Sequence, residues 1–238
     1  ILLISAARMI VQLILLGFYL KYLFIINHPL INFLWLLVIV IIANVTILQR
    51  NNFKVRLFLM KTIWAYLLTM TLLLCIFGVV LSFHRVINAW YIIPLGGMLL
   101  GNMMNTNTIG FDRFYRELSK RQHEYIHLVL LGASRQEATK PFLREAYKSA
   151  ITPQLNHLAT VGIVSLPGIL TGQILGGALP NSAIRYQMMI MLALFLSSTV
   201  SNFLALNFSI QASFDKTGQL KDFYHHSNTT KYMRKQHE

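Results

Sequence analysis

Six long apolar runs occupy most of the sequence, and no Asp or Glu lies within any of them. An α-helix needs roughly 20 mostly apolar residues to cross the hydrocarbon layer of a membrane. Inside that layer only helices and closed barrels satisfy their own backbone polar groups, and runs of this length predict helices. The sequence therefore predicts an all-α polytopic bundle that forms a single transmembrane domain over residues 1–238. The six expected spans are 1–26, 30–48, 62–83, 87–106, 155–179 and 186–211.

Composition excludes the main soluble classes of protein. Hydrophobic residues make up 55% of the chain and charged residues only 12%, about half of the roughly 25% that is usual for soluble domains. A single cysteine, Cys75, rules out an intrachain disulfide and is best interpreted as a small buried hydrophobe. A soluble enzyme, a secreted disulfide scaffold and a disordered chain are all inconsistent with these values.

The distribution of basic residues predicts the orientation in the membrane. Of 21 Lys and Arg residues, four lie at 50–61, eight at 111–150 and five in the tail at 214–238. The other side has only Lys21, Arg85 and Arg185. By the positive-inside rule, the 50–61 loop, the 111–150 segment and the C-terminus are cytoplasmic, in a multi-pass protein of the cell membrane. The net charge of +13 follows from this topology, so no nucleic-acid partner is expected.

The 111–150 segment contains signals for two helices and a turn. Apolar residues have helical spacing over 111–131, and Gly132 follows as a left-handed C-cap. Ser134 and Glu137 form the pattern of a capping box, which predicts a second helix at 134–149. Such a helix-turn-helix either projects as a knob that a partner binds or lies on the lipid surface, and the residues alone leave both interpretations open.

Several stretches resemble a known transporter family. The loop from Glu124 to Pro153, with LLGASRQEA at its centre, is similar to the coupling loop of ABC-transporter permeases. The more specific stretches are TVGIVSLPGILTGQILGG at 160–177, AIRYQ at 183–187, IPLGGMLLGN at 93–102 and ARMIVQLILLGFYLKYLF at 7–24. Together they resemble the FetB-type family, the membrane subunits of a bacterial iron exporter, which has plant relatives linked to aluminium tolerance.

The resemblance implies a function and two partners. It implies an iron-exporting or metal-exporting permease that pairs with a second copy of itself and with a separate ABC ATPase, which would hold the ATP and Mg. It also implies one further span before the first residue of this chain. The residues that would couple the permease to the ATPase are Glu124, Gly132, Ala133, Ser134, Glu137 and Pro153.

Small residues and prolines are concentrated in two of the apolar runs. Gly168, Gly172 and Gly176 are spaced four apart, so two helices could approach closely along them, and Pro167 should kink the helix or split it into two halves. These positions form either a packing face or a gate. The candidate gate or packing residues are Pro94, Gly97, Gly101, Asn102, Pro167, Gly168, Gly172 and Gly176.

Few side chains in the runs could contact a substrate. Arg8 and Gln12 lie one turn apart on one face of the first run, where Arg8 either extends to the membrane surface or lines a pore. Met98 and Met189 belong to methionine clusters that serve as core filler or as ligands for a soft metal. These four residues are the candidate translocation path, and no metal site is assigned.

The chain has no motif for catalysis of its own. It lacks a GxxxxGK[ST] phosphate loop and any Ser-His-Asp arrangement. No cofactor is expected in this chain, and ATP hydrolysis is assigned to the partner. Two other functions fit: an importer permease of the amino-acid or metal type, and a membrane anchor or assembly factor without transport activity.

Overall fold

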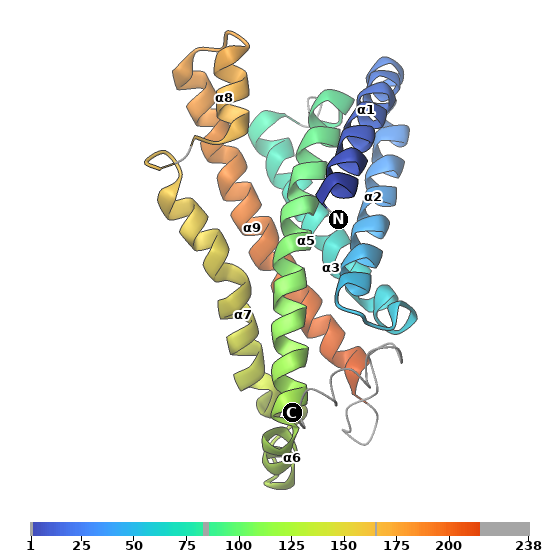
Figure 1. Ribbon diagram of the computed structural model, residues 1–238, viewed down its shortest axis with the longest axis vertical. Coiled ribbons are helices and arrows are strands. Elements are labelled where there is room, and N and C mark those ends of the chain that lie inside the picture. Colours follow the sequence, from blue (N-terminus) through green and yellow to red (C-terminus); the bar gives the residue numbers. More distant parts are fainter. Residues whose placement is uncertain (1, 83–85, 165, 215–238) are drawn as a thin grey trace.

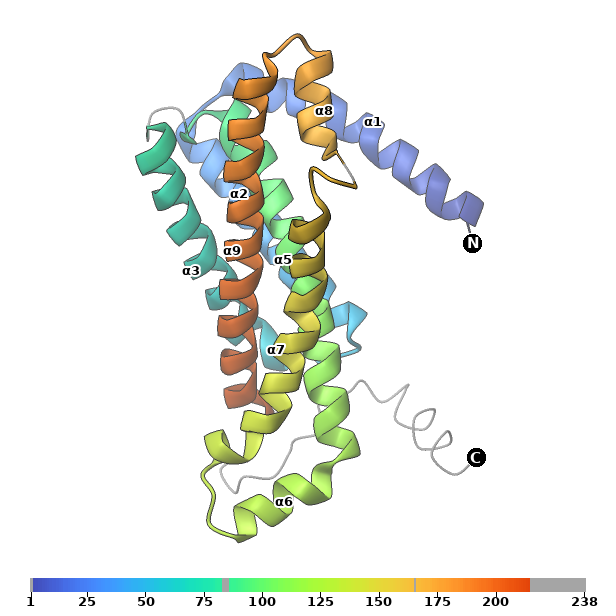
Figure 2. The ribbon, with the colours of Figure 1, turned by 90° about the vertical axis from the view of Figure 1, so that its left-hand side faces the viewer.

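The computed structural model describes residues 2–82, 86–164 and 166–214, and every regular element in those ranges is an α-helix. Figures 1 and 2 show an elongated bundle of long helices. The all-α fold class is confirmed, whereas the tail expected at 214–238 lies outside the described residues except for Phe214. The helices are α1 (Leu2–Ile26), α2 (Pro29–Arg50), α3 (Val55–Leu81), α5 (Ala89–Lys120), α6 (Gln122–Leu130), α7 (Arg135–Thr160), α8 (Gly168–Leu175) and α9 (Pro180–Ser213).

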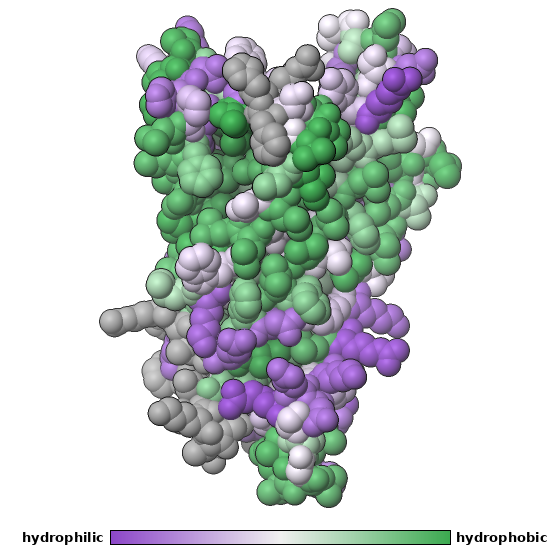
Figure 3. Space-filling model, turned by 180° about the vertical axis from the view of Figure 1, so that it is seen from behind, coloured by the Kyte–Doolittle hydropathy of each residue, from purple (hydrophilic) through white to green (hydrophobic). Residues whose placement is uncertain are grey.

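Four of the described helices are long and apolar enough to cross a membrane. These are α1, α2, α3 and α9, which correspond to the expected spans at 1–26, 30–48, 62–83 and 186–211. Their inward faces carry fully buried side chains such as Val40, Tyr66 and Leu206. Many large apolar side chains remain exposed on the outside, and Figure 3 shows them as a broad belt above a band of hydrophilic residues. An apolar belt of this kind is suited to contact with lipid.

The expected span at 87–106 and the expected helix at 111–131 have different boundaries from those predicted. Residues 89–120 form one helix, α5, and Pro94 lies inside it without ending it. At 32 residues, α5 is about 48 Å long, well over the roughly 30 Å of a hydrocarbon layer. The chain becomes charged after residue 110 but stays helical, because hydropathy and helix propensity are separate properties. The helix ends only at Arg121, after which α6 begins.

The expected span at 155–179 is wrong as a single helix. The helix that begins at Arg135 continues to Thr160, Gly162 follows with a φ of 85°, and Pro167 is the N-cap of the short helix α8. Proline has no N–H to donate and disfavours the helical conformation in the residue before it. Pro167 therefore marks the start of α8, whereas α7 has already ended at Thr160, before the turn at Gly162. The 8 residues of α8 span only about 12 Å.

The connections between helices lie at two ends of the bundle (Figures 1 and 2). The turn between α2 and α3, the helix α6 and the C-terminal end of α9 lie toward one end, which we call the α6 end. The turn between α1 and α2 and the turn between α8 and α9 lie toward the other. The 50–61 and 111–150 segments are thus on the same side of the bundle. Which side faces the cytoplasm stays a prediction from the basic residues.

Candidate functional site

A layer of polar side chains crosses the middle of the bundle and joins three helices. Asn102 of α5 donates its amide Nδ2 to the backbone carbonyl of Leu194 in α9, at 2.9 Å. Gln154 of α7 donates Nε2 to Asn102 Oδ1 at 2.8 Å and to Thr106 Oγ1 at 3.2 Å. Each polar group inside an apolar bundle needs a partner from the protein, so these bonds define the register of α5, α7 and α9.

A second polar cluster lies next to this layer, between α5 and α9. Asn107 donates Nδ2 to Ser201 Oγ at 2.7 Å, and Asn202 donates Nδ2 to Asn107 Oδ1 at 3.1 Å. All three side chains are buried. Gly110 makes room for this cluster, because a Cβ atom at that position would lie only 2.3 Å from Asn202 Nδ2. The lack of a side chain at Gly110 is therefore what allows α5 and α9 to approach.

Of this polar set, sequence reasoning identified only Asn102. The signal that could have revealed the rest is the occurrence of Gln154, Asn107 and Asn202 in or beside apolar runs, where uncharged amides are costly unless paired. Their partners could not be read from the sequence, because Asn102 and Gln154 are 52 residues apart and Asn107 and Asn202 are 95 apart.

The junction between α5 and α6 is held by Arg121. Its guanidinium donates to both carboxylate oxygens of Glu124, each at 2.8 Å, and to Glu145 of α7 at 3.0 Å. It also lies over the ring of Phe142, 5.2 Å from its centroid. The hydrogen bond with Glu124 raises the pKa of Arg121 above its already high value, so the residue stays cationic. Sequence reasoning did not single out Arg121, which sets the direction of α6 relative to α7.

The turn after α6 has the expected local chemistry. Gly132 has a φ of 91°, and Ala133 donates its N–H to the carbonyl of Leu128 at 3.1 Å, which closes a Schellman motif. The capping box is confirmed, with Ser134 at the N-cap and both reciprocal bonds to Glu137 present. The hydrogen bond from the Ser134 side chain lowers the pKa of Glu137, which keeps the carboxylate ionised at neutral pH. The helix that begins here continues to Thr160, however, and does not end at 149.

The outer tip of α6 is apolar and exposed. Leu130 is 79% exposed and Leu131 is 72% exposed, and Ile126 and Val129 lie beside them on the surface. Tyr125, on the opposite face, is buried and contacts Phe214. Figure 3 shows a patch of hydrophobic residues at the α6 end, beyond the hydrophilic band. We call Ile126, Val129, Leu130 and Leu131 the apolar tip.

The predicted coupling residues separate into two groups. Glu124, Gly132, Ala133, Ser134 and Glu137 lie on α6, on the turn and at the start of α7. Pro153 lies inside α7, many residues farther along the helix. There it lines an open cleft of about 670 Å³ together with Arg113, Glu145, Lys148, Ser149 and Thr152.

The predicted gate and packing residues are not brought together within one chain. Asn102 is part of the polar layer, but a Cβ atom at Gly97, Gly101, Gly168 or Gly172 would meet no atom within 4 Å. At Gly176 the only nearby atoms belong to α8 itself. Pro167 caps α8 and Pro94 is exposed on α5. A close seam between these glycines and a second copy stays a prediction.

The predicted path residues are also dispersed. Arg8 and Gln12 are exposed on α1, and Figure 2 shows that the N-terminal part of this helix projects away from the bundle. Met98 and Met189 are partly buried on α5 and α9. In the described residues no three His, Cys, Asp or Glu side chains come together as metal ligands. The exposed Cys75 is not the buried hydrophobe that was expected.

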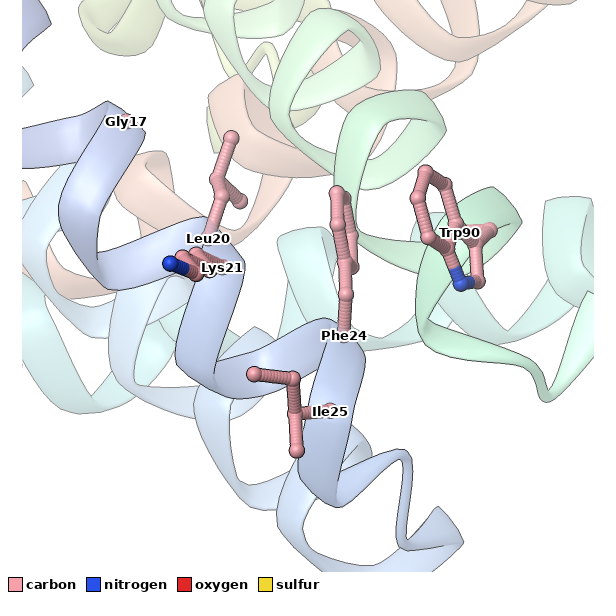
Figure 4. A pocket seen from close by; sticks show the side chains of 6 residues that line it. All are labelled: Gly17, Leu20, Lys21, Phe24, Ile25 and Trp90. Atoms are coloured by element: carbon pink, nitrogen blue, oxygen red, sulfur yellow. The ribbon is translucent and has the colours of Figure 1, made fainter.

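A second cleft lies where α1 meets the start of α5. Phe24 stacks on Trp90 with 4.2 Å between the ring centroids, and both rings line this cleft of about 520 Å³. Figure 4 shows these two rings side by side, with Lys21 on the neighbouring turn of α1. The cleft is open and mostly apolar, which fits contact with lipid better than a site for chemistry.

Comparison with known proteins gives the family. The chain matches an uncharacterised protein family, UPF0014, over residues 1–214. It is 30% identical over 200 residues to the UPF0014 membrane protein YjkA of Bacillus subtilis strain 168, covering 83% of this chain and 78% of that protein. It is 27% identical over 216 residues to the probable iron export permease protein FetB of Escherichia coli K12, covering 91% of this chain and 82% of FetB.

The relatives extend to plants. Protein ALUMINUM SENSITIVE 3 of Arabidopsis thaliana is 32% identical over 131 residues, covering 55% of this chain and 48% of that protein. No solved structure matches the chain. The resemblance to the FetB-type family is confirmed. Because the family match includes the polar layer, α6 and all four apolar spans, the chain belongs to the UPF0014 family of membrane proteins.

Proposed function

We propose that the chain is the membrane permease subunit of an ABC exporter that moves iron or another metal ion, with ATP and Mg held by a separate ATPase. The observation that carries the proposal is the apolar tip of α6. Exposed apolar patches of this kind are typical of protein interaction sites. Support for the substrate comes from FetB, a relative along most of the chain that is named as a probable iron export permease.

The coupling element is α6 together with the turn and the start of α7. Movement of the ATPase on ATP binding would push on the apolar tip, and Arg121 would transmit it to α7 through Glu145. α7 is bonded to the polar layer through Gln154, so a shift of α7 changes the packing of α5 and α9. This path links the ATPase to the middle of the membrane.

The transporter consists of two copies of the chain, and each copy crosses the membrane six times. In addition to the four apolar helices, α5 crosses with its first half, and α7 and α8 together form a broken crossing. Broken helices are a common feature of transport pathways. The exposed glycines at 97, 168 and 172 are then available to the second copy, because no described helix of the same chain covers them.

Substitutions at the α6 tip test the coupling. Leu130→Asp or Ala133→Glu should leave the amount of protein in the membrane unchanged but abolish co-purification with an ABC ATPase encoded beside it, because each places a charge in the contact. Asn52→Asp is the control, since it adds the same charge at an exposed position of the turn between α2 and α3, outside the coupling element. Pull-down and substrate-stimulated ATP hydrolysis are the measurements. Wild-type binding and stimulation by Leu130→Asp would exclude the coupling role and would favour an anchor or a lipid-surface segment.

Cysteine labelling tests the orientation. In a protein with Cys75 replaced by Ala, cysteines at Asn52 and Lys120 should react with an impermeant reagent only from the cytoplasmic side. A cysteine at Asn88 should react only from the other side. The expectation follows from the excess of Lys and Arg at 50–61 and 111–150. Labelling of position 120 from outside the cell would reverse the proposed topology.

A further inference from the structure

The outer face of α7 is polar. Thr152, Asn156 and Thr160 are four residues apart, so they lie on one face of the helix, and His157 borders this face. All four side chains are exposed. The opposite side of the helix carries the buried Ala150 and faces the bundle. We call the four exposed residues the α7 polar face.

This face lies at the depth of the membrane interior. Gln154 is bonded to Asn102, which is bonded to the carbonyl of Leu194. Leu194 is near the middle of the apolar span Pro180–Gln211. With a rise of about 1.5 Å per residue, the α7 polar face lies within about 10 Å of that level. The hydrocarbon layer extends roughly 15 Å to each side of its middle.

Two side chains of the face have no hydrogen-bond partner among the described residues. The threonine hydroxyls are satisfied within α7, because Thr152 donates to the carbonyl of Lys148 at 2.6 Å and Thr160 to that of Asn156 at 3.0 Å. The Asn156 amide and the His157 imidazole make no hydrogen bond within the described part of the chain. Unpaired amide and imidazole groups are costly in hydrocarbon, so this face does not lie against lipid tails.

The α7 polar face is continuous with the cleft of about 670 Å³ near the α6 end, because Thr152 belongs to both. Pro153 has no N–H, so the carbonyl of Ser149, which also lines the cleft, lacks its usual helical donor. The cleft carries both signs of charge, since Arg113 and Lys148 lie around Glu145. A polar track therefore runs along α7 from the charged end of the bundle into the membrane interior.

We propose that this track lines a water-filled route through the membrane, which the same face of a second copy completes, and that Asn156 and His157 contact a transition-metal cation in transit. The inference rests on the proposed transport function and names the part of the chain that performs it. Imidazole nitrogen suits Fe, Zn, Ni and Cu, and an amide oxygen supplements it. Neither ligand carries a negative charge, and weak contacts of this kind allow an ion to leave as well as to bind.

Reaction of single cysteines with a membrane-impermeant methanethiosulfonate tests the route. In the full-length protein with Cys75 replaced by Ala and the ATPase co-expressed, Asn156→Cys and Thr160→Cys should react at least about tenfold faster than two controls, because thiols ionise only in water. The controls are Leu155→Cys on the same helix and Leu192→Cys on α9, whose native side chains are 50% and 66% exposed. Equal rates at Asn156 and Leu155 would overturn the proposal. If two Asn156→Cys copies form a spontaneous disulfide and the cysteine is not labelled, the two faces meet without water between them. This result would also overturn the proposal.

Protection by a metal tests the contact with a cation. Co²⁺ should slow the labelling of Thr160→Cys by roughly threefold or more, and His157→Ala should remove this protection. Equal protection with and without His157 would overturn its role. Labelling needs neither ATP nor export, so it is independent of the proposed function. If the labelling pattern is as expected but the complex shows no ATP-driven metal export, only the proposed exporter function is wrong. If the complex exports metal but the cysteines of the α7 polar face are not labelled, only the proposed route is wrong.

Discussion

Gly110→Ala is expected to destabilise the protein strongly, whereas Gly101→Ala on the same helix should be almost neutral. A Cβ atom at position 110 would lie 2.3 Å from Asn202 Nδ2, whereas one at position 101 would meet nothing within 4 Å. To relieve the clash, the Asn202 amide must turn away from Asn107 or α5 must move from α9. The overpacking and the buried unpaired amide together should lower the free energy of unfolding by about 2–4 kcal/mol.

The unfolding temperature of the purified protein in detergent measures this effect, along with the fraction that elutes as a single species. The double variant Gly110→Ala with Asn202→Ala is the sharper test. Removing the Asn202 amide makes space for the new methyl group, so the double variant should be more stable than the sum of the two single effects implies. Additive effects, or an unchanged unfolding temperature for Gly110→Ala, would show that α5 and α9 do not approach as described.

Arg121→Ala is expected to reduce substrate-stimulated ATP hydrolysis by roughly tenfold or more while the permease still reaches the membrane. Arg121 joins α6 to α7 through Glu124 and Glu145, so without it the apolar tip has no fixed direction. Arg121→Lys should restore the activity only in part, because an ammonium cannot make the forked pair with Glu124. ATP hydrolysis by the assembled complex is the measurement.

Arg144→Ala is the matched control for Arg121. Arg144 is exposed on α7, next to Glu145, and makes no hydrogen bond or ion pair within the described residues. Its loss should therefore leave the stimulation near the wild-type value. If Arg121→Ala retains full stimulation, the junction is not the element that transmits movement. If both variants lose stimulation equally, the effect is one of general surface charge.

Local properties of the sequence determined much of the fold. Hydropathy alone predicts α1, α2, α3 and α9, because a lipid-facing helix must be apolar along its whole length. The Schellman turn at Gly132 and the capping box of Ser134 and Glu137 involve residues close in the chain, so their short-range chemistry is readable as well. A helix that begins at Pro167 was one of two outcomes that proline chemistry permits, but the end of α7 at Thr160 was not predicted.

Hydropathy did not predict the full lengths of α5 and α7. α5 continues past residue 110 because charged residues support a helix as well as apolar ones do once it leaves the membrane. α7 has too many polar residues to be recognised as a spanning helix, yet its register is defined by Gln154 against Asn102. Neither property follows from an average over a window of sequence.

Only the tertiary structure decided which polar residues meet. Asn102, Gln154 and Leu194 join three helices, and Arg121 reaches Glu145 of α7 across the α6 turn. Such pairs depend on the rotation and register of whole helices, which are set by packing over many residues. The same holds for position 156: the sequence shows an asparagine near an apolar run, but only the packing of α7 shows that this residue points away from its own bundle. The sequence therefore could not identify the residues that pair across helices, or those without a partner in the described part of the chain, because spacing along a chain does not encode the contacts between its helices.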